Sequence, residues 1–136
     1  MKRLISLSAI IFCCIFAINA QENDSVYHLV DKKAEFPGGD RALMNWLNEN
    51  IKYPEFAYKN NIQGKVYVNF IVRENGSIDS VKIARGVHSS LDNEAIRLVK
   101  AMPKWKPGLK NGVAVKSYFT LPVTFVLKED KSKTKH

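Results

Sequence analysis

The residues with the most chemically suggestive spacing are His88, Ser89, Ser90 and Asp92, because serine, histidine and aspartate are the components of a hydrolytic triad. A triad is defined by its geometry, however, and these four residues lie within five positions at the expected start of a helix. Ser89, with Asp92 three residues later, has the spacing of a capping box, in which side chains satisfy the free N–H groups of a helix terminus. We therefore interpret the cluster as a helix cap.

The remaining candidate ligands and acids are isolated from one another. His28 has no second histidine at the spacing of a metal site. Neither the pair Asp79 and Glu94 nor the pair Glu49 and Glu55 lies in a motif that would hold two carboxylates on one substrate. The sequence therefore predicts no metal, no cofactor and no enzymatic activity.

The first 20 residues have the pattern of a secretory signal peptide. Lys2 and Arg3 precede an apolar run over 4–18, and Ala20 supplies a small residue before the expected cut. The alternative is an uncleaved membrane anchor. A 15-residue run would span about 22 Å as a helix, which is short of the roughly 30 Å of hydrocarbon in a bilayer. We expect cleavage and export.

Cysteine usage and charge restrict the exported part further. Both cysteines, Cys13 and Cys14, lie inside the expected signal, so the mature domain has no disulfide and no thiolate metal site. Without Lys2 and Arg3 the basic residues fall from 21 to 19 against 13 acids, and the net charge falls from +8 to +6. Part of this excess lies in 128–136, which we interpret as a solvated, disordered tail. Export and the lack of a recognition motif argue against a nucleic-acid partner.

The clearest structural signal is a β-hairpin over 65–85. Apolar residues alternate at Val66, Val68, Phe70 and Val72. The pair Asn75-Gly76 then predicts a type I′ turn, which needs positive φ at both central residues. Ile78 does not fit the alternation of apolar residues in the second strand of the hairpin, so a bulge can occur there.

Other elements flank this hairpin. We expect a short edge strand within 26–30, a helical extension over 40–60 that Asp40 can cap and that breaks before Pro54, a helix over 90–102, and a strand over 113–127. Pro122 places that last strand at an edge of the sheet, or at a bulge. The prediction is an α+β fold, a small antiparallel sheet packed against one helix, with Trp105 in the core. The expected segments are the signal peptide at 1–20, a flexible segment at 21–34, one domain at 35–127 and the tail at 128–136.

The order of the local motifs is distinctive. They are Phe36-Pro37-Gly38-Gly39, Tyr53-Pro54 with Ala57, Gly64-Lys65-Val66, Asn75-Gly76-Ser77, Leu91-Asp92 with Glu94-Ala95, Trp105 with Pro107-Gly108, and Leu121-Pro122-Val123 with Phe125. In this order they resemble the C-terminal domain of TonB-family energy transducers, over about residues 35–127.

The resemblance implies a periplasmic domain that binds the TonB box of outer-membrane transporters by strand addition beside its last strand. Carried over to this chain, the peptide-binding edge would run from about Val115 to about Val126. Its candidate binding residues are Val115, Lys116, Ser117, Tyr118, Phe119, Thr120 and Leu121. Asn50, Tyr53 and Pro54 would lie near the peptide, and many relatives have glutamine where this chain has Asn50. Gly64, Asn75, Gly76, Trp105, Pro107 and Gly108 would be structural.

The chain also departs from the family pattern. Full transducers have a long proline-rich spacer, whereas about 15 residues separate the expected cut from Phe36, a reach of at most about 50 Å. The membrane histidine used with the proton-channel complex is absent from the apolar run. Our first hypothesis is an exported module that binds extended peptides. The alternatives are a short transducer anchored in the inner membrane and partnered with that complex, and a homodimer in which the edge pairs with a second copy.

Overall fold

Two long strands form the centre of the sheet. The computed structural model describes residues 25–127. Strand β2 (Gly64–Val72) and strand β5 (Val113–Phe125) pair antiparallel, without a register shift, from Gly64↔Phe125 to Val72↔Ser117. Where these strands pair, apolar side chains are buried on one face, with Ser117 as a buried polar exception, and most side chains on the other face are polar and exposed, as the two-residue period predicts.

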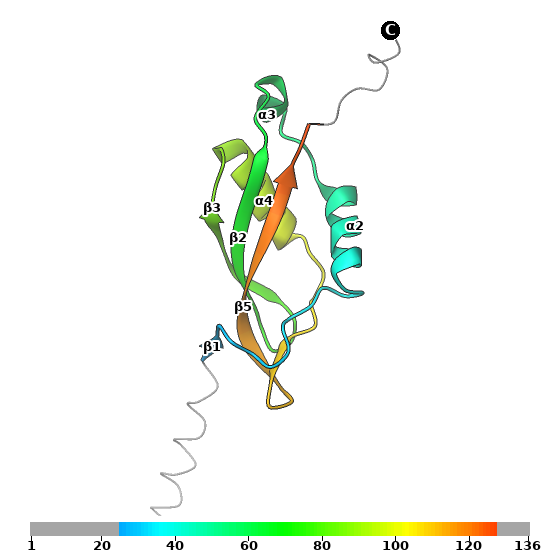
Figure 1. The fold of residues 1–136 in the computed structure, drawn as a ribbon, viewed down its shortest axis with the longest axis vertical. Helices are drawn as coiled ribbons and strands as arrows, with labels where there is room; N and C mark the ends of the chain where they lie inside the picture. The colour runs from blue at the N-terminus through cyan, green and yellow to red at the C-terminus, as the bar shows by residue number, and fades with distance from the viewer. Residues whose placement is uncertain (1–24, 128–136) are drawn as a thin grey trace, which may run out of the picture.

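Three shorter strands complete the sheet (Figure 1). Strand β3 (Ile78–Arg85) pairs antiparallel with β2 through two register shifts, so the bulge that the parity of the returning strand allowed is present. Strand β4 (Gly108–Lys110) forms a hairpin with β5, and β1 (Val26–Tyr27) pairs with β5 in parallel. The strand order is β1-β5-β2-β3, and the sheet is antiparallel except at β1.

The turn between β2 and β3 is not the predicted type I′ turn. Gly76 has φ +86, but Asn75 is not among the residues with positive φ. The N–H of Gly76 donates to the carbonyl of Arg73 at 2.8 Å, which is the hydrogen bond of a type I turn followed by a left-handed glycine. The Asn75 side chain accepts from the N–H of Ser77 at 3.0 Å and stabilises this longer loop. Two successive positive φ values occur instead at Asn111-Gly112, between β4 and β5.

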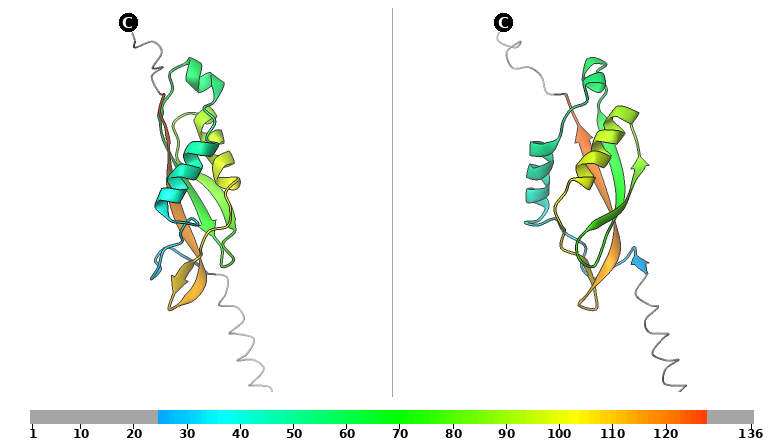
Figure 2. Two further views of the ribbon diagram at one scale, coloured as in Figure 1. Left: turned by 90° about the vertical axis from the view of Figure 1, so that its right-hand side faces the viewer. Right: turned by 180° about the vertical axis from the view of Figure 1, so that it is seen from behind.

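Three helices accompany the sheet: α2 (Asp40–Asn50), α3 (Glu55–Lys59) and α4 (Ser89–Lys100). The first two are the predicted extension, interrupted before Pro54, and the third is the predicted helix that packs on the sheet. Figure 2 shows α4 covering one face of the sheet, while α2 lies beside β5 at the sheet margin.

Two predicted helix caps are wrong. Gly39 caps α2 without a side-chain hydrogen bond, and Asp40 is already inside the first turn. His88 caps α4, because its Nδ1 accepts from the N–H of Ser90 at 3.1 Å. Asp92 accepts from the N–H of Val87 at 3.0 Å, so no capping box with Ser89 forms. A histidine ring nitrogen serves here as the acceptor that serine and aspartate usually provide.

Trp105 is buried in the core, as predicted. Its indole packs edge-on against Phe36, Phe70 and Phe119, with ring centroids 5.8, 5.3 and 4.8 Å away. The backbone N–H of Trp105 donates to the carbonyl of Gly76 at 2.9 Å. A Cβ on Gly76 would lie 2.0 Å from the carbonyl oxygen of Trp105, so only glycine fits where these two segments meet.

The segment before α2 is paired and not free. Within the stretch expected to be flexible, residues 25–34 contain β1, the predicted short edge strand, and Lys32 exchanges two backbone hydrogen bonds with Leu109 of β4. Ala34 is buried. The expectation of flexibility is therefore wrong for this part of the segment. The expected signal at 1–20 and the basic tail at 128–136 lie outside the described residues.

Candidate functional site

Strand β5 has one fully paired edge and one partly open edge. Over the register from Ser117 to Phe125 its inner edge pairs with β2. The outer edge pairs with β1 at Lys116 and Ser117. From Tyr118 to Phe125, the strand pairings of the described residues involve β2 alone. Over this stretch the outer edge has no strand partner among residues 25–127.

Pro122 indicates which backbone groups of β5 point outward. In an antiparallel ladder, successive residues direct their N–H and C=O groups alternately to the two sides. Pro122 has no N–H, yet it pairs with Tyr67 inside the unshifted ladder, so its nitrogen must face away from β2. Leu127, which has the opposite parity, donates its N–H to Gln63 Oε1 on the β2 side at 2.9 Å. The even-numbered residues of β5 therefore present their backbone groups at the outer edge.

The predicted peptide-binding edge is thus only partly open. Val115 pairs with Gly108 of β4, and Lys116 and Ser117 pair with β1. These three residues were predicted to face an incoming peptide, and the chain's own backbone already pairs with them. The open stretch begins at Tyr118 and continues past Leu121 to Phe125, close to the predicted limit at about Val126.

A groove lies at the carboxyl end of the open stretch. It has a volume of about 590 Å³ and lies between α2 and the end of β5. Its lining contains no charged side chain and consists of Met44, Asn48, Ile51, Tyr53, Tyr58, Thr124, Phe125, Val126 and Leu127. Met44 and Val126 are large apolar side chains that remain more than half exposed. The site therefore combines an open row of backbone groups with an apolar wall.

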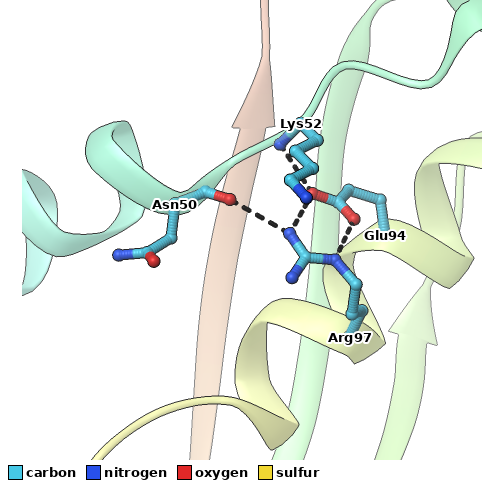
Figure 3. Close-up of polar contacts among 4 residues, drawn as sticks. All are labelled: Asn50, Lys52, Glu94 and Arg97. Atoms are coloured by element: carbon cyan, nitrogen blue, oxygen red, sulfur yellow. Dashed lines mark hydrogen bonds and ion pairs between the residues drawn. The ribbon is translucent and has the colours of Figure 1, made fainter.

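A polar cluster fixes the end of α2 against α4 (Figure 3). The buried carboxylate of Glu94 accepts from the backbone N–H of Lys52 at 2.7 Å and from Arg97 at 2.5 and 2.8 Å. Arg97 also donates to the carbonyl of Asn50 at 3.0 Å. Its hydrogen bond with Glu94 raises the pKa of Arg97, although partial burial opposes this. The cluster sets where α2 ends, and hence the position of the groove wall.

Of the residues predicted to lie near a peptide, Tyr53 lines the groove. Its ring packs edge-on against Phe125 with a centroid distance of 5.9 Å, and its hydroxyl donates to the carbonyl of Ile62. Burial raises the pKa of the Tyr53 hydroxyl. Asn50 turns its side chain back to the carbonyl of Trp46 at 2.8 Å, and Pro54 caps α3, so neither lines the groove.

Sequence reasoning missed the wall formed by α2. Met44 and Asn48 are one helical turn apart and lie off the buried stripe of Leu43 and Leu47. An apolar Met44 beside that stripe is the only signal that the sequence offered. It did not indicate that the helix would lie beside a strand edge.

The residues with triad-like spacing lie at the start of α4, where His88 is the cap in place of the predicted Ser89, and His28 stacks on Tyr118 with a ring-centroid distance of 4.3 Å. Among residues 25–127, no group of three or more histidine, cysteine, aspartate or glutamate side chains is arranged to hold a metal ion. The same range contains no helix that is long and apolar enough to cross a membrane.

Comparison with known proteins places this geometry in context. The family model described as the Gram-negative bacterial TonB protein C-terminal matches residues 49–127. Two similar solved structures are NMR structures of the Helicobacter pylori TonB C-terminal domain. The one of residues 194–285 is 23% identical, covers 66% of this chain and 95% of that chain, and has a TM-score of 0.50. The one of residues 179–285 is 23% identical, with coverages of 69% and 89% and a TM-score of 0.49. No curated protein matches the chain.

Proposed function

This chain belongs to the TonB C-terminal family, and on that premise we propose that the outer edge of β5 binds an extended peptide segment of an outer-membrane transporter by strand addition. The family is associated with energy-coupled transport across the outer membrane, and its domains are typically periplasmic and couple transport without being enzymes. Strand addition to β5 is the finer step that we infer for this chain.

The observation that carries the proposal is the stretch from Tyr118 to Phe125, which pairs with β2 alone. Strand edges that face solvent are usually blocked, because unpaired N–H and C=O groups recruit other chains. Here the block is partial. Pro122 removes one donor and β1 covers the edge only as far as Ser117. An accessible edge beside a groove is the arrangement that strand addition requires.

The strength of a backbone-only complex can be worked out from this edge. Beyond Tyr118, which adjoins the end of β1, Thr120 and Thr124 each present one N–H and one C=O, and Pro122 presents a carbonyl, which makes five groups between residues 120 and 124. At about 1 kcal/mol net for each hydrogen bond, they contribute about 5 kcal/mol, equivalent to a Kd near 0.2 mM. Ordering a flexible peptide weakens this further. Micromolar binding would therefore need side-chain contacts in the groove.

The experiment is a titration of the isotope-labelled protein with a transporter plug peptide that carries a TonB box, followed by amide chemical shifts. The largest changes are expected at Thr120, Thr124 and Val126, with little change in β3. The variant Thr124→Pro removes an outward N–H and should weaken binding severalfold, whereas Thr124→Val keeps that N–H and should not show this loss. Shift changes confined to other surfaces would show that β5 is not the peptide site.

The location of the protein is a second part of the proposal. We infer that residues 1–20 direct export and are removed, so that the mature domain lies in the periplasm. The mass of the protein recovered from cells tests this. Loss of about 20 residues is expected, and the mass of the full chain would instead support the membrane-anchored alternative.

A further inference from the structure

The groove beside β5 bears on which peptides this domain selects. Only the last two residues of α2 fall within the segment that the family model matches, and Met44 and Asn48 precede that segment. The wall of the groove is therefore a feature of this chain beyond the matched part of the family domain.

We propose that the edge of β5 selects a segment in which apolar and acidic side chains alternate, with the apolar ones in the groove. The proposal rests on the proposed function, because the alternation has meaning only for a bound strand. Successive side chains of a strand point to opposite faces. A strand added to β5 would point every second side chain toward the α2 side of the sheet, where those near the end of β5 enter the groove, and the others would lie beside the exposed face of the sheet.

The groove accepts apolar side chains because of what lines it. Met44 and Ile51 lie on the side of α2, and Tyr53 and Phe125 lie on the side of the sheet. The lining has no charged group, so a charged side chain entering it would lose water without gaining an ion pair. An apolar side chain would instead bury surface against Met44, which is 53% exposed in the free protein.

The opposite face of the sheet favours acidic side chains. Residues paired across a sheet have their side chains on the same face, and three residues of β5 on the exposed face stand in rows that each contain one base. Thr124 stands beside Lys65, Pro122 is in the row of Tyr67 and Arg85, and Thr120 is in the row of Asn69 and Lys82. All three bases are exposed.

A further row on the same face contains an acidic side chain that already has a basic partner. Asp79 is in the row of Ile71 and Tyr118, and it lies 3.6 Å from the guanidinium of Arg73. The three bases therefore give this face a positive field. Lys65, on β2, is the base nearest to an added strand, at about two strand spacings, or roughly 10 Å. At that distance the charge effect is modest and depends on salt.

Four acetylated, amidated peptides test the alternation. The reference is Gly-Glu-Val-Glu-Val-Glu-Gly. The second replaces both valines by serine, the third replaces every glutamate by lysine, and the fourth has the same composition in the order Gly-Glu-Glu-Val-Val-Glu-Gly. Binding is followed by the amide shifts of Thr120 and Thr124. The reference should bind at least fivefold more tightly than the serine and reordered peptides, and about two- to threefold more tightly than the lysine peptide at low salt.

Variants of α2 test the groove itself. Met44→Asn should lower the affinity for the reference peptide about threefold to tenfold and leave the affinity for the serine peptide unchanged. Asn45→Met is the matched control, because Asn45 is the exposed neighbour on the same helix but does not line the groove. The double variant Met44→Asn/Asn45→Met conserves composition and should behave as Met44→Asn.

The outcomes separate the two proposals. If all four peptides shift the edge amides with equal affinity, or if Met44→Asn binds the reference peptide as the parent does, selection by the groove is refuted while strand addition stands. If no peptide shifts the amides of Thr120 and Thr124, both proposals fall.

Discussion

The substitution Pro122→Val is expected to strengthen peptide binding, although it removes a residue that the family motif contains. The nitrogen of Pro122 faces outward, so a valine there would add one N–H in the middle of the open edge and leave the ladder with β2 intact. One additional backbone hydrogen bond contributes about 0.5–1.5 kcal/mol, which corresponds to a decrease in Kd of about 2- to 13-fold.

The stability of the domain should change little in this variant. Loss of the proline lets the unfolded chain explore more conformations and costs about 0.4–1 kcal/mol, while the β-branched valine favours a strand and offsets part of that. Peptide affinity is measured by titration of edge amide shifts, and stability by urea denaturation. Thr124→Val, which places the same side chain two residues away without adding a donor, is the control.

Two results would refute the reasoning behind Pro122→Val. An unchanged or weaker affinity would mean that the added N–H finds no acceptor on a bound strand. Slower hydrogen exchange at Tyr67, the partner of residue 122 in β2, would mean that the new N–H completes the ladder with β2, so that the proline nitrogen faces inward and the outward parity is wrong. Light scattering over a concentration series would also reveal whether the extra donor promotes pairing between two copies.

Three further predictions concern the support of the site. Gly76→Ala should lower the free energy of unfolding by about 3 kcal/mol or more, because the alanine Cβ would meet the carbonyl of Trp105 at a position with φ +86. Gly112→Ala is the control in the same denaturation assay. It has φ +76 but no atom within 4 Å of the added Cβ, so it should cost about 1 kcal/mol. Glu94→Ala leaves the N–H of Lys52 without its acceptor and should cost about 1–3 kcal/mol, with faster hydrogen exchange at Lys52. Deletion of residues 25–28 removes β1, so peptide-induced shifts should extend to Lys116; shifts that still stop at Tyr118 would show that β1 does not limit the edge.

The partial closure of β5 also limits the ligand. The stretch from Tyr118 to Phe125 is eight residues long, which at about 3.4 Å per residue accommodates roughly 27 Å of extended peptide. The stack of His28 on Tyr118 lies where β1 ends. A longer segment would have to displace β1 or leave the sheet at that point.

The sequence by itself determined the elements whose signals are local. The two-residue period of β2 and β5 and the prolines at 54 and 103 placed strands and helix ends within a few residues of their observed bounds. Pro122 predicted an edge or a bulge at its own position, because the lack of an N–H is a property of one residue wherever it lies. The family resemblance rested on the same local motifs.

Only the tertiary structure decided how much of that edge is open. β1 reaches β5 across some 90 residues of chain, and nothing in Val26 or Tyr27 specifies that partner or its parallel direction. The turn at Asn75-Gly76 took its form where the backbone of Trp105 binds Gly76, and the wall of the groove depends on Glu94 holding the end of α2. Pairings of this kind depend on which distant backbone groups find each other as the core forms, and single-residue preferences do not encode that.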